Sequence, residues 1–351
     1  MRTAITLNDF VFDSSPGFGE VAGHVVAADR MGVDTIWSAE AWGTDAVVPL
    51  AFLAARTERI RLGSGVMQIT ARVAAMTAMT AMTLDHVSDG RFVLGLGASG
   101  PQIVEGLHGT RYDRPLERLR ETVEVIRLAL AGEKVAYSGK QIVLPLPHGE
   151  GKAIRIGQPP RPGIPIHLAT LGPKALAYTG AVADGWIGTC FVPECAGYYI
   201  AQLRIGAASA GRTLDGFEIS AGGPVAFTDD IERPVRRRKK ALAFQLSAMG
   251  SATANFYNDA FSRIGYADAA REVRDLWLAG RRDDAVTAVP DELALRTSLF
   301  GTDDMIRGRI RAYRAAGVTD LRLEPMGATA TERLETLDRV LDLVRDVSTE
   351  P

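Results

Sequence analysis

Three glycines in the first third of the chain have the spacing of a nucleotide-binding motif. Gly95, Gly97 and Gly100 in "RFVLGLGASGPQ" give G-x-G-x-x-G after an apolar run. A dinucleotide-binding fold needs a helix that opens at the last glycine, and a strand ending in an acidic residue about 20 residues further on. Here Pro101 follows the last glycine, "EGLHGTRYDR" is expected to be irregular, and the next regular pattern is a long amphipathic helix. The motif therefore fails as a nicotinamide site and predicts a strand end whose backbone another group approaches closely.

Glu40 is the acidic residue at a predicted strand end that adjoins aromatic side chains, Trp37 and Trp42. A carboxyl group in such a position is a candidate proton donor or acceptor. It could equally hydrogen-bond a cofactor or a backbone amide, and the residues alone leave both roles open. The other strand ends are rich in glycine and small side chains, which favours a large flat ligand over a hydrolase site with paired carboxylates or a nucleophile triad.

The segment "ATLGPK" is a candidate anion site. Gly172 can cap a helix whose first residue is Pro173, where the missing N–H costs nothing. The free amides and the helix dipole, together with the Thr170 hydroxyl and Lys174, would favour a phosphate. An ordinary Gly-Pro helix start is the alternative.

His108 and Tyr112 lie in the predicted loop "EGLHGTRYDR" and are candidates for substrate contact, unless the loop only packs on itself. His167 lies within the apolar "IPIHLAT", which is typical of a core histidine. The chain has two cysteines and no H-E-x-x-H, C-x-x-C or P-loop pattern. We therefore expect neither a metal nor a disulfide framework. The methionines at 76, 79 and 82 have helical spacing and predict core packing.

These groups must be positioned by short apolar runs that alternate with amphipathic ones. Strands are predicted at residues 4–7, 34–39, 60–66, 91–97, 164–170, 185–189, 218–227 and 320–325. Helices are predicted at residues 20–31, 47–58, 75–87, 115–130, 173–183 and 332–344. Eight strands alternating with helices predict an α/β fold, a (β/α)8 TIM barrel in a single domain over residues 1–351. A doubly wound open sheet is the alternative.

Two segments exceed what a minimal barrel needs. They lie at about residues 134–164 and 229–300, and we expect both to be insertions that shape the substrate mouth. Function in a barrel belongs at the C-terminal strand ends, where the candidate residues described above lie.

The overall charge excludes some partners. With 351 residues and a formal net charge of −2, the chain is not expected to bind nucleic acid or anionic membranes. The run "RRRKK" at 236–240 is expected to be the solvated face of a helix. The first residues form no apolar signal region and no segment holds 18 uncharged apolar residues, so we expect a cytoplasmic protein without membrane contact.

The segment "RIRLGSGVMQITARVAAMTAMTAMTLDHVSDGRFVLGLGASG" resembles the bacterial luciferase-like superfamily, in particular the branch that uses the deazaflavin coenzyme F420. The third strand ends in G-S-G-V, the Ala- and Met-rich helix closes with "TLDHVSDGR", and the following strand ends in G-x-G. "LATLGPKALAYTGAVADGWIG" is similar to the phosphate segment of the family. The order of elements matches along nearly the whole chain and least between residues 229 and 300.

The resemblance implies an F420-dependent oxidoreductase that passes a hydride to or from an organic substrate, with roles for individual residues. A non-prolyl cis peptide would fall on Gly65–Val66 and support the middle of the cofactor ring system. Sugar-phosphate dehydrogenases of this branch have a histidine after the acidic residue, whereas Ala41 follows Glu40 here, so that alcohol-oxidising mechanism is not expected. The residues expected at the cofactor are Glu40, Gly65, Val66, Met67, Thr70, Gly97, Ala98, Ser99, Thr170, Leu171, Gly172 and Trp186, and those expected at the substrate are Asn8, Trp42, His108 and Tyr112.

Two other functions remain open from the sequence. One is an FMN-dependent monooxygenase of the same superfamily, and the other is a non-catalytic flavin or deazaflavin carrier, which the shortage of acid–base groups would permit. The resemblance also favours a homodimer acting on a small-molecule substrate. We expect F420 to bind more tightly than FMN, because the strand ends offer glycines, aliphatic groups and aromatic groups that suit a stacked hydride carrier.

Overall fold

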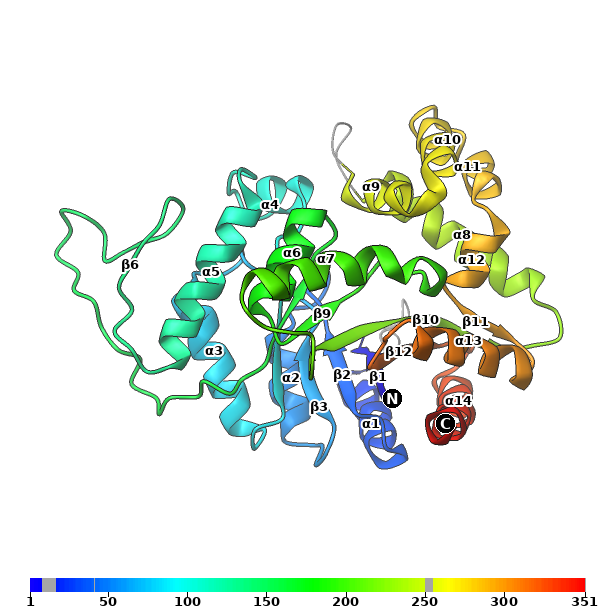
Figure 1. Cartoon of the computed structure of the whole chain (residues 1–351). Coiled ribbons are helices and arrows are strands. Elements are labelled where there is room, and N and C mark those ends of the chain that lie inside the picture. Colours follow the sequence, from blue (N-terminus) through cyan, green and yellow to red (C-terminus); the bar gives the residue numbers. More distant parts are fainter. Residues whose placement is uncertain (8–16, 41, 250–254, 351) are drawn as a thin grey trace.

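A closed parallel barrel forms the centre of the computed structural model, which describes residues 1–7, 17–40, 42–249 and 255–350. Its hydrogen-bonded ring follows the order β1-β2-β3-β5-β8-β9-β10-β12 and returns to β1 (Figure 1). The eight strands are β1 (Arg2–Thr6), β2 (Thr35–Ser38), β3 (Arg61–Ser64), β5 (Phe92–Gly97), β8 (Ile166–Ala169), β9 (Gly185–Ile187), β10 (Glu218–Phe227) and β12 (Asp320–Pro325). The predicted (β/α)8 barrel is confirmed, and each ring strand overlaps a predicted one.

Two short strands extend the ring at the C-terminal ends of its strands. β4 (Met67–Gln68) continues β3 after a bulge and pairs with the end of β5, and β11 (Leu299–Gly301) pairs with the end of β10. The helices around the barrel are α1 (Phe18–Met31), α2 (Val47–Ala54), α3 (Ala74–Val87), α4 (Pro101–Gly106), α5 (Pro115–Leu130), α6 (Pro173–Val182), α7 (Ala196–Ser209), α13 (Asp303–Ala315) and α14 (Ala330–Thr349), with a 3-10 turn at Pro193–Cys195.

Strand alternation divides the apolar residues into an outer and an inner layer. Ile36 of β2 packs outward against the helices, whereas Trp37 points into the barrel and meets Val93 and Ile187. The lumen is narrow there because Trp37 fills it: a Cβ on Gly63 would lie 2.3 Å from the indole ring. The barrel interior is therefore a packed core below its mouth.

A short helix corrects the expectation for the segment after Gly100. α4 begins at Pro101 and spans six residues, with Gly100 as its N-cap, where the sequence predicted an irregular chain. Proline is well tolerated at the first helical position, since the N–H that it lacks would be unpaired there. The next element is still a helix, α5, so the nicotinamide interpretation remains excluded.

The first insertion forms an arm along α5. It contains the antiparallel pair β6 (Tyr137–Ser138) and β7 (Val143–Leu144). The carboxylate of the buried Glu121 on α5 accepts hydrogen bonds from the three successive amides at 140–142, at 2.7 to 2.8 Å. The arm projects sideways in Figure 1, so it does not shape the mouth as expected.

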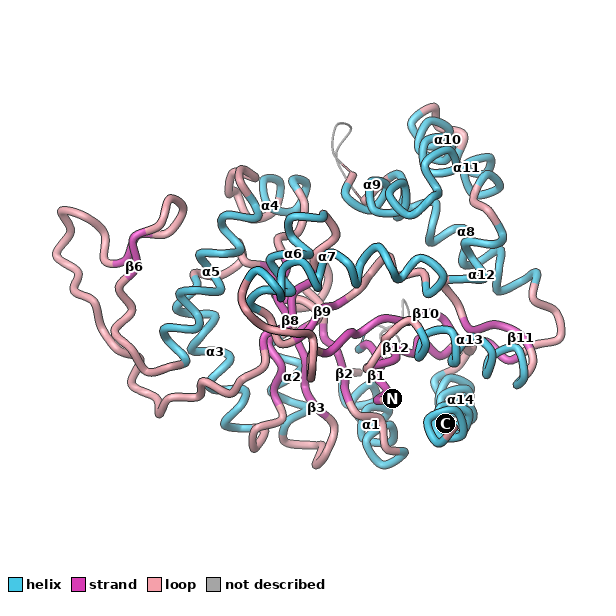
Figure 2. The backbone as a smooth tube through the Cα atoms, viewed as in Figure 1, coloured by secondary structure: helices cyan, strands magenta, loops and turns pink. Residues whose placement is uncertain are grey.

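The second insertion is a helical cap on one half of the barrel rim. It comprises α8 (Glu232–Ser247), α9 (Phe256–Phe261), a π-helical turn (Ser262–Tyr266), α10 (Ala267–Leu278), α11 (Arg282–Ala288) and α12 (Asp291–Arg296) (Figure 2). Its apolar core includes or contacts residues that follow β8, β9 and β12, namely Leu171, Cys190 and Met326. The ends of β2, β3 and β5 lie on the other half of the rim.

The methionine series of α3 and the basic run of α8 each divide between inward-facing and outward-facing side chains. Met82 is fully buried as expected, but Met76 and Met79 are 50% and 40% exposed, because helical spacing cannot tell a core-facing side from one that faces outward. In the basic run on α8, Arg236 and Lys240 are exposed, whereas Arg238 turns inward and its Nε donates to Thr297 Oγ1 at 3.1 Å. No helix among the described residues is long and apolar enough to cross a membrane.

Candidate active site

A cis peptide bond joins Gly65 to Val66 where β3 ends, as the resemblance predicted. The Gly65 amide donates to the Ser38 carbonyl at 2.7 Å, and the Glu40 amide donates to the Val66 carbonyl at 3.3 Å. These bonds attach the bulge to the end of β2. The Val66 side chain points into the mouth of the barrel, where it contacts the inner apolar cluster.

Glycines of β5 accommodate this bulge. A Cβ on Gly97 would lie 2.7 Å from Val66 Cγ2, and one on Gly95 would lie 1.8 Å from the Ser64 carbonyl oxygen. The Ser64 hydroxyl also exchanges hydrogen bonds with both backbone groups of Gly95 at 2.9 Å. The G-x-G pattern therefore admits the neighbouring strand and its bulge, which is the close approach that the sequence predicted without identifying the group.

The carboxylate of Glu40 lies against the bulge in a network of hydrogen bonds. Its Oε1 accepts from the Gln68 amide at 2.9 Å and from Arg72 Nη1 at 2.6 Å, and its Oε2 accepts from the Ala46 amide at 3.5 Å. Arg72 also binds Asp45 at 2.8 Å. Burial lowers the pKa of Arg72, but the hydrogen bonds and charges of the two carboxylates outweigh it and raise that pKa above its ordinary value. Glu40 thus has the contacts of a positioning residue.

The aromatic residues beside Glu40 in sequence do not enclose its carboxylate. Trp37 lies in the lumen core at 3% exposed, and Trp42 is 63% exposed. Trp42 is therefore available at the surface near the rim, whereas Trp37 is part of the barrel filling.

Two predicted cofactor residues meet two predicted substrate residues beside β5. Thr70 Oγ1 lies 2.9 Å from His108 Nδ1, and the Tyr112 hydroxyl donates to the Ser99 carbonyl at 3.2 Å. Ser99 has a left-handed backbone with φ of 57°. Burial raises the pKa of Tyr112 to about 12, so this phenol stays protonated as a hydrogen-bond donor at neutral pH. Half-buried Ala98 completes this edge of the site.

The start of α6 is open, as an anion site requires, but Thr170 does not face it. Gly172 is the N-cap, no side chain caps the helix, and a Cβ on Gly172 would meet nothing within 4 Å. Thr170 is buried, and its hydroxyl lies 2.7 Å from Thr179 Oγ1 inside the fold. Threonine at this position therefore anchors α6 instead of offering a free hydroxyl.

Several predicted residues lie away from the mouth. Trp186 is fully buried in the outer layer, where its indole N–H donates to the Thr170 carbonyl at 2.9 Å and its ring packs 5.1 Å from that of Tyr199. Met67 is likewise in the outer core, because strand alternation turns it away from the lumen side that Val66 occupies. Leu171 packs against the helical cap. Asn8 lies outside the described residues.

Sequence reasoning missed Arg72 and the contribution of the cap. Arg72 approaches Glu40 from 32 positions away, and no local pattern marks that pairing. The Phe256 ring of α9 lies 6.0 Å from that of Tyr112, so the cap reaches the substrate-side loop. An aromatic pair at the start of a helix, Phe256 and Tyr257, was the available signal.

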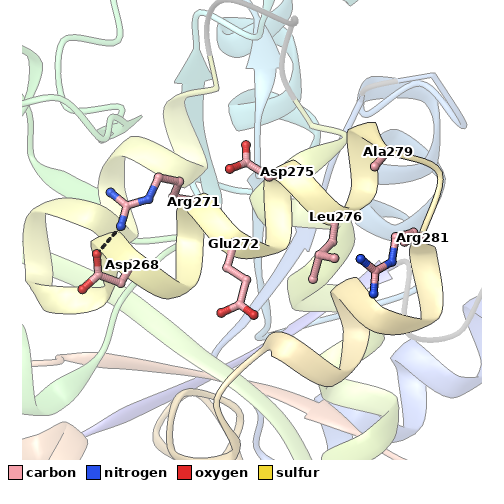
Figure 3. Close-up of a pocket in the computed structure, with 7 residues that line it drawn as sticks. All are labelled: Asp268, Arg271, Glu272, Asp275, Leu276, Ala279 and Arg281. Carbon is pink, nitrogen blue, oxygen red and sulfur yellow. Dashed lines mark hydrogen bonds and ion pairs between the residues drawn. The ribbon is translucent and has the colours of Figure 1, made fainter.

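No other feature of the described surface is a candidate active site. Among the described residues, no group of three His, Cys, Asp or Glu side chains could hold a metal ion. Figure 3 shows a surface pocket on the cap, whose lining includes the exposed ion pair Asp268–Arg271. Its lining comes from α10 and the turn that follows, and none of it comes from a barrel strand.

Comparison with known proteins places this geometry in a family. The luciferase-like monooxygenase model matches residues 4–320. A candidate coenzyme F420-dependent oxidoreductase of Mycobacterium tuberculosis, Rv3520c, is 42% identical over 303 residues, covering 84% of this chain and 87% of that one.

Two solved structures share the fold. The coenzyme F420-dependent tetrahydromethanopterin reductase of Methanopyrus kandleri superposes with a TM-score of 0.76 at 21% identity, covering 96% of this chain and 97% of that one. The FMN complex of the oxygenating constituent of 3,6-diketocamphane monooxygenase from Pseudomonas putida gives 0.68 at 17% identity and covers 98% of each chain. The family match spans most of the chain, and the cis bulge and glycine strand end are those that the resemblance predicted. The chain belongs to the luciferase-like monooxygenase family.

Proposed function

We propose that this protein is a coenzyme F420-dependent oxidoreductase that transfers a hydride between the deazaflavin and a small organic substrate. The observation that carries the proposal is the packing of the Val66 side chain against Gly97 at the barrel mouth. The 42% identity to a candidate F420-dependent enzyme supports the choice of cofactor within the family.

The residues present fit such a cofactor. Val66 and Ala169 give the mouth an apolar floor, and Gly97 adds no side chain beside them. The uncapped amides at the start of α6 follow directly from β8 and would hold the phosphate. β8 pairs with β5 in the register Gly97 to Ala169, so the ring and phosphate positions are adjacent on the rim.

When bound, F420 supplies a ring carbon that accepts or donates a hydride, while the protein orients it. In this proposal the bulge at Val66 supports one ring face, and Glu40 fixes the bulge through the Gln68 amide and Arg72. His108, held at Nδ1 by Thr70, has the position to hydrogen-bond a substrate oxygen. Tyr112 donates to Ser99 and shapes the loop beside it.

Spectroscopic titration of the purified protein with F420 and FMN tests the cofactor. We expect F420 to bind more tightly and to displace FMN in direct competition. Tighter binding of FMN, with oxygen consumption by the reduced complex, would establish the monooxygenase alternative. Tight cofactor binding with no added ligand able to perturb the bound chromophore would favour a carrier.

A homodimer is part of the same proposal. α2 and α3 lie side by side and expose an apolar face, whose members are between 39% and 74% exposed: Val48, Phe52, Val73, Met76, Met79 and Val87. Exposed apolar side chains gathered on neighbouring helices are typical of an interaction site. A second copy of the chain would cover it.

A further inference from the structure

Strand β12 presents a line of charged side chains to the barrel interior. Leu321 and Leu323 belong to the outer core, so alternation turns the residues between and beyond them, Arg322 and Glu324, toward the lumen. Arg322 pairs in register with Ala4 of β1 on one side and Gly222 of β10 on the other. Arg322 therefore lies one inward-facing position closer to the mouth than Asp320, the first residue of β12.

The surroundings of Arg322 are small and apolar. Its two strand neighbours in register, Ala4 and Gly222, carry a methyl group and a hydrogen, and Ala169 adds another methyl group to the interior. Both Arg322 and Glu324 are half-buried, and within the described ranges neither side chain forms a hydrogen bond or an ion pair, although both backbones pair in the sheet. A half-buried guanidinium without a partner is costly, because it has lost water without gaining an acceptor.

A second guanidinium approaches from the helical cap. Arg238 of α8 turns away from its exposed basic neighbours, and among the described residues its one hydrogen-bond partner is Thr297 Oγ1, 3.1 Å from its Nε. Burial lowers the pKa of Arg238, and the carboxylate of Glu324 acts in the opposite direction. Among the residues that the structure describes here, two guanidinium groups face one carboxylate, which leaves an excess of positive charge.

An apolar wall stands above these charges. Leu171, Ala226 and Met326, which lie at or just beyond the ends of β8, β10 and β12, pack against the helical cap. The proposed cofactor phosphate site at Gly172 follows β8, which is three strands away from β12 around the ring. The charges of β12 are therefore separate from that site.

We infer that Arg322, assisted by Arg238, binds the anionic oxygen group of the substrate, which is an organic acid with an apolar body. The inference deepens the proposed function and rests on it for the position of the reacting ring. A planar guanidinium binds a carboxylate through two parallel N–H···O bonds, so a carboxylate is the group that it fits best.

Calorimetric titration of the F420-loaded protein with three probes tests this inference. Benzoate and phenyl phosphate are anionic, and benzamide has the shape of benzoate without its charge. We expect benzoate to bind and benzamide to bind at least about tenfold more weakly, as loss of a charged hydrogen-bond pair implies. Binding of phenyl phosphate alone would assign the group as a phosphate and would still support an anion site.

Variants separate this site from the cofactor. Arg322→Met should weaken benzoate about tenfold or more, and Arg238→Met less, while Arg236→Met on the exposed side of α8 should change nothing. Affinity for F420, measured separately by fluorescence, should stay within a few-fold in all three. Equal binding of benzoate and benzamide to the unmodified protein overturns the inference without any variant, and so does a loss of F420 binding in Arg322→Met. If the unmodified protein binds no F420, the proposed function fails, and benzoate titration of the same protein still reports on Arg322.

Discussion

The carboxylate of Glu40 accepts hydrogen bonds from two backbone amides and a guanidinium, and this decides what the side chain can do. A group whose two oxygens are both occupied is suited to hold the bulge at Val66, and a proton carrier would need a free oxygen aimed at the substrate. Of the two roles that the sequence left open for Glu40, the geometry therefore favours a structural contribution to cofactor binding.

Glu40→Gln tests that assignment. Glutamine keeps one acceptor oxygen but replaces the other with an amide NH2 group, which can only donate, and removes the charge that pairs with Arg72. We expect F420 affinity to fall about tenfold, from loss of a charged hydrogen bond, with turnover of the saturated enzyme changed only a few-fold. Asp45→Asn is the control, because it alters the other carboxylate on Arg72 and leaves the Gln68 and Ala46 contacts intact. Unchanged affinity with collapsed turnover would assign proton transfer to Glu40.

His167 makes stability depend on pH. It is fully buried beside Glu218, and burial lowers its pKa to about 4, against the pull of Glu218 and Asp184 and with the help of Arg61 and Arg2. The unfolded chain has a histidine pKa of about 6.5, so between these values only the unfolded state binds the proton. The contribution of neutral His167 to the free energy of unfolding is complete above pH 6.5 and is lost as the pH falls towards 4. It amounts to about 3 kcal/mol at most.

Denaturant unfolding at several pH values measures this effect. We expect His167→Gln to be less stable at pH 7 but to lose less free energy of unfolding between pH 7 and pH 4 than the unmodified protein. If the free energy of unfolding changed equally with pH in the two proteins, His167 would not bind a proton on unfolding.

At the scale of elements, the contact between β3 and β5 depends on a position with no side chain. A Cβ on Gly95 would lie 1.8 Å from the Ser64 carbonyl oxygen, and backbone cannot move aside as a flexible side chain can. We expect Gly95→Ala to destabilise the fold by about 3 kcal/mol, as overpacking of a core does. Gly157→Ala is the matched control, since nothing lies within 4 Å of that position. Thermal unfolding of both variants gives the comparison, and equal midpoints would contradict the packing argument.

Much of this element order could be predicted, because buried parallel strands leave continuous apolar runs and α5 begins and ends where its pattern does. α4 was missed because proline was treated as a breaker when it stood at a helix start. Trp186 was assigned to the rim because a strand of three residues gives too little alternation to tell its faces apart. The partners Arg72 and Glu40 meet only through the closed barrel, so spacing along the chain could not identify them.

At the scale of the whole molecule, the exposed face of α2 and α3 predicts a dimer of twice 37.6 kDa. Met76→Glu places a charge on that face and should give monomers in sedimentation velocity, because an unpaired charge buried in an interface is costly. Leu278→Glu, on α10 and 60% exposed, is the control and should leave the mass unchanged. A monomeric unmodified protein at micromolar concentration would refute the prediction.

The residues that line the barrel interior are of two kinds, which lie at different heights along its axis. Near the base, Glu218 is held by Arg2 at 2.8 Å and Arg61 at 3.0 Å, beside the buried His167. Near the mouth, Gly97 and Ala169 contribute little beyond backbone. Substrate preference can therefore drift by changes at the mouth while the base keeps the chain folded. A library for directed evolution should vary Trp42, which is exposed near the rim, and His108, and should leave the base unchanged.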